Sequence, residues 1–103
     1  MRILITGADG FLGSRLLAHM RREGWDVAGL VRNPSTKQLP EGEYFHYAFP
    51  AEIDPNAFAK PADVLIHCAF AMRDFTQYRQ NREAAAFLHR QRTHGVHFFD
   101  VRP

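Results

Sequence analysis

The chain has 103 residues, of which 46% are hydrophobic, as expected for a single globular domain with one core. Its one cysteine, Cys68, excludes an internal disulfide, and no apolar run reaches the roughly 20 residues of a membrane-spanning helix. We therefore expect a cytoplasmic protein without a membrane partner. The net charge of +2, with no basic motif interleaved with aromatic residues, predicts no nucleic-acid partner.

Apolar runs and breaker residues predict strands that alternate with helices along the chain. The strand runs are continuously apolar rather than alternating, which is typical of a sheet that is covered on both faces. In chain order the predicted elements are a strand at Arg2–Thr6, a helix at Phe11–Glu23, strands at Asp26–Val31 and Glu43–Ala48, a short helix near Pro55–Ala59, a strand at Asp63–His67, a helix at Asp74–Thr93 and a strand at Val96–Val101.

Residues with known end preferences mark the predicted helix ends. Gly24 is placed to end the first helix, Asp74 to cap the long last helix, and Gly95 to end it. Five arginines lie between residues 73 and 92, around this last helix. They are interpreted as a solvated helix face, with a phosphate-binding face as the alternative.

Alternating strands and helices predict a fold of the α/β class in which right-handed crossovers build a parallel sheet. We expect a doubly wound sheet of about five strands in the order 3-2-1-4-5, forming one domain over residues 1–103. The domain is expected to be truncated after its fifth strand.

Three glycines follow the first strand at a spacing of three residues, in the stretch T-G-A-D-G-F-L-G. Gly7 allows a sharp turn, Gly10 allows the backbone to approach a pyrophosphate, and Gly13 allows the helix to pack on the strand. The helix that begins here directs unpaired N–H groups and the positive end of its dipole to the same place. The spacing favours a dinucleotide-binding turn; the alternative is a turn that uses glycine for geometry only.

The opening M-R-I-L-I-T-G-A-D-G-F-L-G resembles the start of extended short-chain dehydrogenases/reductases, the NAD(P)-dependent epimerase/dehydratase group with a Rossmann fold. The stretch D-V-L-I-H-C-A at residues 63–69 is similar to that family's fourth strand. The stretches Y-R-Q-N at residues 78–81 and G-V-H-F-F at residues 95–99 are similar to its next helix and fifth strand. These matches come in the family's order over nearly the whole chain.

The resemblance implies a set of cofactor-binding residues. Ala69 is expected near the nicotinamide ribose, with Phe70 where the family often has a second alanine, and Asn81 helps to shape the site or is a partly exposed helix residue. Asp9 would oppose the phosphates unless it points outward. The implied residues are Gly7, Asp9, Gly10, Phe11, Leu12, Gly13, Arg32, His67, Ala69 and Asn81.

The end of the second strand predicts which nucleotide is bound. An acidic residue there binds the 2′-hydroxyl of NAD, whereas an arginine accommodates the 2′-phosphate of NADP. The acidic position falls on Val31, and Arg32 follows it. We therefore expect NADP, with NAD as the alternative cofactor; an exposed loop arginine is the other interpretation of Arg32.

The resemblance also implies a catalytic tyrosine four residues before a lysine, and the chain has none. The residues four positions after Tyr44, Tyr47 and Tyr78 are two alanines and an arginine. The six histidines match no common zinc spacing, and Cys68 at a strand end is expected to be inert. We therefore assign no catalytic residue and no metal ligand.

Three functions remain open at this point. The first is a nucleotide-binding domain that does not turn over alone. The second is a fragment or subunit of an active oxidoreductase or sugar-nucleotide epimerase, and the third is a non-enzymatic interaction module. The last strand, at Val96–Val101, would form an exposed sheet edge, which predicts a homo-oligomer that associates through this edge.

Overall fold

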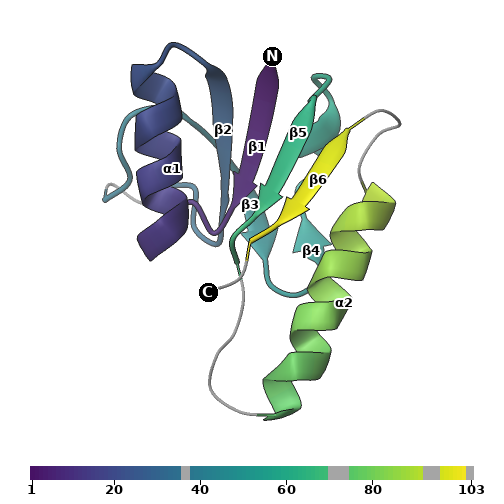
Figure 1. The fold of residues 1–103 in the computed structure, drawn as a ribbon. Coiled ribbons are helices and arrows are strands. Elements are labelled where there is room, and N and C mark those ends of the chain that lie inside the picture. Colours follow the sequence, from purple (N-terminus) through teal and green to yellow (C-terminus); the bar gives the residue numbers. More distant parts are fainter. Residues whose placement is uncertain (36–37, 70–74, 92–95, 102–103) are drawn as a thin grey trace.

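The computed structural model describes residues 1–35, 38–69, 75–91 and 96–101. It is an α/β fold in which two helices flank one sheet (Figure 1). The elements are β1 (Arg2–Thr6), α1 (Phe11–Arg22), β2 (Asp26–Val31), β3 (Glu43–Ala48), β4 (Glu52–Ile53), the 3-10 helix η1 (Pro55–Phe58), β5 (Val64–His67), α2 (Phe75–Gln91) and β6 (His97–Asp100).

The sheet has the strand order β4-β3-β2-β1-β5-β6. The pairs β1–β2, β1–β5, β2–β3 and β5–β6 are parallel, which confirms the doubly wound order expected for five strands. One further strand, β4, was not predicted, and it pairs antiparallel with the end of β3. Its ladder joins only two residue pairs, and a two-residue strand beside Pro50 carries no periodic pattern from which it could be found.

The two helices cover opposite faces of the sheet and bury two separate clusters. Leu17 of α1 packs with Ile3 and Ile5 on one face. Leu88 of α2 packs with Leu4 on the other. Side chains of one strand alternate between the two clusters, as the two-residue period of a strand requires. Among the described residues, neither helix is long and apolar enough to cross a membrane.

Gly24 ends α1 as predicted. Its φ of +82° is in the left-handed region, and its N–H donates to the Arg21 carbonyl at 3.0 Å. The N–H of Trp25 donates to the Met20 carbonyl at 3.0 Å, so the last carbonyls of the helix are satisfied. The predicted cap Asp74 and the predicted stop Gly95 lie outside the described residues.

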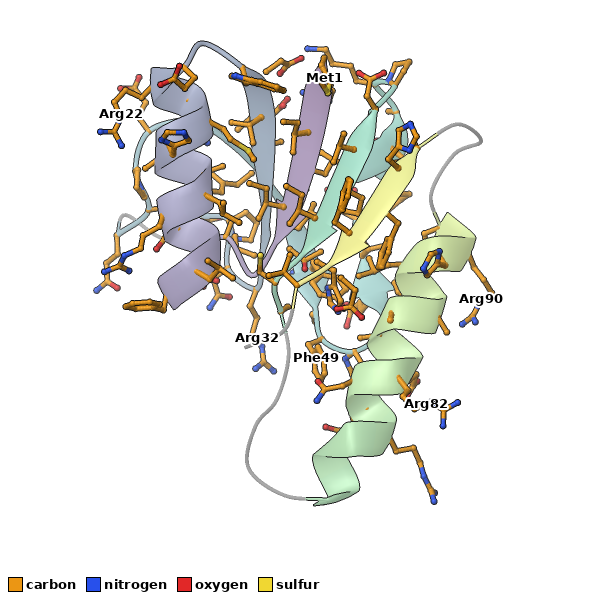
Figure 2. All side chains as sticks on the ribbon, in the orientation of Figure 1. Met1, Arg22, Arg32, Phe49, Arg82 and Arg90 are labelled. Carbon is orange, nitrogen blue, oxygen red and sulfur yellow. The ribbon has the colours of Figure 1, made fainter. Side chains whose placement is uncertain are left out.

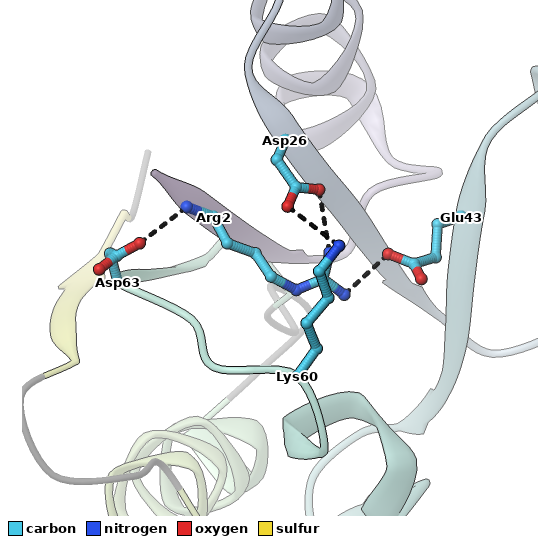
Figure 3. Close-up of polar contacts among 5 residues, drawn as sticks. All are labelled: Arg2, Asp26, Glu43, Lys60 and Asp63. Atoms are coloured by element: carbon cyan, nitrogen blue, oxygen red, sulfur yellow. Dashed lines mark hydrogen bonds and ion pairs between the residues drawn. The ribbon is translucent and has the colours of Figure 1, made fainter.

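A network of charges joins the amino ends of the strands (Figure 3). The side chain of Arg2 is only 4% exposed, and its Nη1 donates to Asp26 Oδ1 at 3.0 Å. Its Nη2 lies 2.7 Å from Glu43 Oε1, an ion pair whose angles fall short of a hydrogen bond. The Arg2 N–H donates to Asp63 Oδ2 at 2.8 Å, and Lys60 Nζ pairs with Asp26 at 3.3 Å. The network ties β1 to β2 and β3 at one end of the sheet.

Candidate functional site

The carboxyl ends of β1, β2 and β5 meet at the opposite end of the sheet from this network. The parallel register pairs Thr6 of β1 with Leu30 of β2 and with His67 of β5. Ligands of open α/β sheets bind outside the carboxyl ends of the strands, where the strand order reverses. Figure 2 shows Arg32 projecting from this end, which is also where α1 begins. Most of the predicted site residues therefore lie in one region.

The three glycines of the turn at residues 7–13, here called the glycine turn, have different steric surroundings. Gly7 has a φ of +65°, and a Cβ added to it would lie 2.9 Å from the Ala69 nitrogen. A Cβ on Gly13 would overlap the Gly7 carbonyl. Gly10 has an ordinary φ of −84°, and a Cβ there would make one tight but tolerable contact, 3.3 Å from the Gly7 oxygen. The fold therefore requires glycine at 7 and 13, but not at 10.

The first turn of α1 presents bare backbone donors. Gly10 is the N-cap and provides no side-chain cap, and the first turn contains no acidic residue. The first bonded amide of the helix is that of Ser14, which donates to the Gly10 carbonyl at 3.0 Å. The N–H groups before it have no intrahelical acceptor. Phe11 is 77% exposed and Leu12 40%, so this end of the helix is open to an anion.

Asp9, the acidic residue of the glycine turn, is exposed, and its direction relative to a phosphate stays a prediction. The neighbouring Ala8 is only 2% exposed and belongs to the core on the α1 side. The turn therefore directs its one acidic side chain to the surface.

Thr6 and His67 form a buried polar link between β1 and β5. They are 0% and 2% exposed, and Thr6 Oγ1 lies 2.6 Å from His67 Nδ1. The same hydroxyl oxygen accepts the N–H groups of Cys68 at 3.0 Å and Ala69 at 3.2 Å. The segment that follows β5 is thus tied to the last residue before the glycine turn. Direct cofactor contact by His67 stays a prediction.

Val31 is the last residue of β2, and Arg32 follows it. Val31, at the acidic position of the family, is 1% exposed, and Arg32 is exposed. The Arg32 carbonyl accepts a hydrogen bond from His46 Nδ1 at 2.9 Å, which fixes the backbone there, and the guanidinium projects from the sheet (Figure 2). Asn81 is 9% exposed on α2, and Phe70 lies outside the described residues.

The sequence analysis did not predict the contacts that Arg15 and Thr6 make beside the glycine turn. The Arg15 guanidinium lies 3.8 Å from the centre of the Phe11 ring and donates to the Phe11 carbonyl at 3.0 Å. The spacing of four residues between an aromatic side chain and an arginine in a helix was the available signal. For Thr6 no signal existed, because its role depends on residues more than 60 positions away.

Two side chains that could serve as a nucleophile or a base, Cys68 and Tyr47, have raised pKa values. Burial raises the pKa of the Cys68 thiol, and the charge of Asp100 raises it further, so the thiol is neutral. Burial raises the pKa of Tyr47 above its ordinary value, and its hydroxyl donates to the Pro50 carbonyl at 3.0 Å. A tyrosine base needs a lowered pKa. Tyr47 therefore has the opposite of the environment that a base requires.

The sequence model of the NAD dependent epimerase/dehydratase family matches residues 3–95. An uncharacterized protein of Schizosaccharomyces pombe is 32% identical over 83 residues, which are 78% of this chain and 28% of that protein.

Two solved structures share the fold. One, a protein from Lactobacillus casei, has a TM-score of 0.79 at 19% identity. The match covers 97% of this chain and 47% of that protein. The other, a Thermus thermophilus UDP-glucose 4-epimerase in complex with NAD, has a TM-score of 0.71 at 23% identity and covers 88% of this chain. The chain spans 33% of that epimerase and less than half of each of the three proteins.

Proposed function

The chain belongs to the NAD dependent epimerase/dehydratase family, and on that premise we propose that the carboxyl end of its sheet binds a nicotinamide dinucleotide through the pyrophosphate. The observation that carries the proposal is Gly10. The fold tolerates a side chain at this position, yet glycine stands there, beside a helix end whose amide groups are uncapped. A close backbone approach to an anion explains both features.

The residues present fit this cofactor. The amides of Phe11, Leu12 and Gly13 would donate to the pyrophosphate, since helix geometry provides them with no other acceptor. We infer that the exposed Asp9 side chain points away from the phosphates. When bound, the nicotinamide ring supplies hydride transfer. This chain's part is to bind the phosphates and to fix the turn that holds them.

We propose NADP as the preferred nucleotide. Val31 is buried where NAD-binding relatives would have a carboxylate, and Arg32 offers an exposed guanidinium to a 2′-phosphate. NAD is the alternative, because the Thermus thermophilus epimerase is in complex with NAD. The two nucleotides differ only in this phosphate, so their affinity ratio measures the contribution of Arg32.

We propose further that these 103 residues bind the nucleotide without turning over a substrate. They contain no tyrosine four residues before a lysine, and the described Tyr47 and Cys68 are held neutral. Membership of an active oxidoreductase or epimerase is the alternative, in which other residues supply the base. Hydride transfer by this chain with a sugar nucleotide as substrate would establish the alternative.

Titration calorimetry with NADPH and NADH tests the binding proposal. We expect binding to the wild-type chain and a loss of at least about 100-fold for Gly10→Val, because the side chain occupies the phosphate position. Ala18→Val, at an exposed position of α1, is the matched control and should bind normally. Absence of binding by the wild-type chain at millimolar nucleotide would refute the proposal and favour an interaction module.

We also propose that β6 pairs with β6 of a second copy. Among the described strands, β6 pairs with β5 alone, and Phe99 is 55% exposed on the face opposite α2. A two-fold axis at Phe99 would pair the edge amides and carbonyls and bring both rings together. Sedimentation should show a dimer that Phe99→Lys dissociates, whereas Trp25→Lys, also at an exposed aromatic, should not. A monomeric wild-type chain would contradict this assembly.

A further inference from the structure

The Thr6 hydroxyl has three neighbours within hydrogen-bond distance. It accepts the N–H groups of Cys68 and Ala69, and its third neighbour is His67 Nδ1, at 2.6 Å. A hydroxyl group has one proton and two lone pairs. Because both lone pairs receive backbone protons, the hydroxyl proton must point to His67. Nδ1 is therefore an acceptor and carries no proton.

This assignment fixes the state of the ring. A neutral imidazole with a bare Nδ1 has its proton on Nε2, and an imidazolium would have protons on both nitrogens. Thr6 is 0% exposed and its hydroxyl oxygen has no further capacity, so it is not a nucleophile despite its short bond to a histidine. The link between Thr6 and His67 positions the chain instead of reacting.

We propose that His67, in its neutral Nε2–H form, is a positioning residue that holds the segment after β5 against the glycine turn, and that a proton on Nδ1 releases this segment and weakens nucleotide binding. The nucleotide part rests on the proposed function. The position of the proton does not, because it follows from the hydrogen bonds of the protein alone.

The release follows from the same count of lone pairs. A protonated Nδ1 would donate to the hydroxyl oxygen, which would then face three donors with two lone pairs. One of the two backbone bonds to the hydroxyl must then be given up: the bond from Ala69 is the longer, at 3.2 Å, and the N–H of Cys68 has a second acceptor in the Thr6 carbonyl at 3.3 Å. The Ala69 nitrogen is also the atom that a Cβ on Gly7 would approach to 2.9 Å. Movement of the Ala69 backbone would remove the contact that holds Gly7 in place from the β5 side.

The surroundings of His67 determine how readily it accepts a proton. Asp100 is the register partner of His67 on β6 and the described carboxylate on that strand. Cys68 on the same segment is neutral. From α2, His89 stacks on Phe98 with ring centres 3.9 Å apart, and Phe98 lies 6.2 Å from the His67 ring.

From α2 the buried Asn81 adds a polar side chain that does not titrate, and Arg82 adds a positive charge on the same helix. The buried, desolvated position of His67 disfavours the charged form.

The first experiment is ¹⁵N NMR of the histidine rings in the wild-type chain without nucleotide. Ring nitrogens with and without a proton are distinguished directly. We expect His67 to show a proton on Nε2 and none on Nδ1 at pH 8, with the Ala69 amide signal shifting as His67 is protonated at lower pH. A proton on Nδ1 at pH 8 would overturn the inference.

The second experiment compares His67→Asn with His67→Leu, which have similar sizes. The asparagine oxygen can accept the Thr6 proton and is never protonated, whereas leucine accepts nothing. Wild-type affinity for NAD, which lacks the titrating 2′-phosphate, should fall about tenfold as the pH is lowered from about 8 until His67 is protonated. His67→Asn should have the same affinity at both ends of this pH range, because its side chain does not titrate. His67→Leu should bind about tenfold more weakly at both.

Two variants of Thr6 test the hydroxyl group of the same hydrogen bond. Thr6→Ser keeps the hydroxyl and should behave as the wild type, and Thr6→Val, of the same shape, should resemble His67→Leu. A His67→Asn variant that retained the wild-type pH dependence would overturn the inference while leaving the proposed function intact. Absence of nucleotide binding would overturn the proposed function and the effect on affinity, and the NMR measurement would still decide the state of His67.

Discussion

The two ends of the sheet use charge in opposite ways. At the amino end the Arg2 side chain is 4% exposed and lies between the carboxylates of Asp26 and Glu43. At the carboxyl end Arg32 is exposed, and the first amides of α1 have no side-chain cap. One end pairs its charges within the protein, and the other presents positive groups to solvent.

This difference separates stability from binding. The charged side chains at the amino end are paired with one another, so they are not available to bind a ligand. Substitutions there should change the free energy of unfolding and not nucleotide affinity. The bare donors at the carboxyl end contribute little to the fold but attract anions. The comparison fails if substitutions at the two ends have the same effects.

The largest expected effect lies within the glycine turn. Gly13→Ala places a methyl group on the Gly7 carbonyl, so we expect a loss of about 3 kcal/mol in the free energy of unfolding. Gly10→Ala should change it by no more than about 1 kcal/mol, because its backbone conformation suits any residue. Urea unfolding followed by circular dichroism measures both. Equal losses would show that Gly10 serves the fold as well.

The next effect concerns the amino end. Arg2→Ala removes a buried side chain and two ion pairs, and we expect a loss of about 2 kcal/mol, moderated because Asp26 and Glu43 are half exposed and regain water. Lys60→Ala removes an exposed partner of Asp26 and should cost less than about 0.5 kcal/mol.

Affinity for NADPH should be unchanged within about twofold in both amino-end variants, which corresponds to less than about 0.5 kcal/mol. A large fall in affinity for Arg2→Ala, with the chain still folded, would show that the two ends are not independent. Calorimetry on the same samples as the unfolding experiments decides this.

A smaller effect distinguishes the two nucleotides. Arg32→Met should weaken NADPH binding about tenfold and leave NADH binding unchanged, because only NADPH carries the 2′-phosphate. Arg22→Met, at the far end of α1, removes the same charge away from the site and is the control (Figure 2). Equal weakening of both nucleotides would refute the assignment of Arg32.

The smallest effect is a pH dependence at the amino end. Desolvation raises the pKa of Asp26, but the hydrogen bond from Lys60 and the charge of Arg2 outweigh it, so the pKa lies below 3.8. Such a group stabilises the folded state at pH values above its unfolded pKa, and this contribution is lost as the pH falls through the folded pKa.

The difference in unfolding free energy between the wild type and Asp26→Asn should therefore be present at pH 7 and shrink below about pH 4. Glu23→Gln, at an exposed carboxylate after α1, gives the background change. A difference that grew toward low pH would mean that the pKa of Asp26 is raised.

Local patterns in the sequence were sufficient to predict the regular elements. β1, β2 and β3 have the predicted bounds: Gly7 follows β1, Arg32 follows β2, and β3 lies between Gly42 and Pro50. The order of the five parallel strands is the one expected for a doubly wound sheet. β4 was missed because its pairing with β3 depends on the chain reversal at Pro50 and leaves no local pattern.

Part of the candidate site was also predictable from local sequence, and part was not. The glycine turn was predictable, since its three glycines lie within seven residues, although the residue that excludes a side chain at Gly7 is the distant Ala69. The link between Thr6 and His67 was not, because a hydroxyl group 61 positions from its partner gives no signal in either segment. The Arg2 network was equally hidden, with partners on β2, β3 and the segment before β5.

Amide chemical-shift mapping with NADPH tests the central claim most directly, because it reports on both ends of the sheet in one titration. We expect saturable shifts for the amides of the glycine turn, Arg32 and Ala69, and none for Arg2, Asp26 or Glu43. Shifts centred on the amino-end residues, or no saturable shift at millimolar NADPH, would contradict the assignment of the carboxyl end as the nucleotide site.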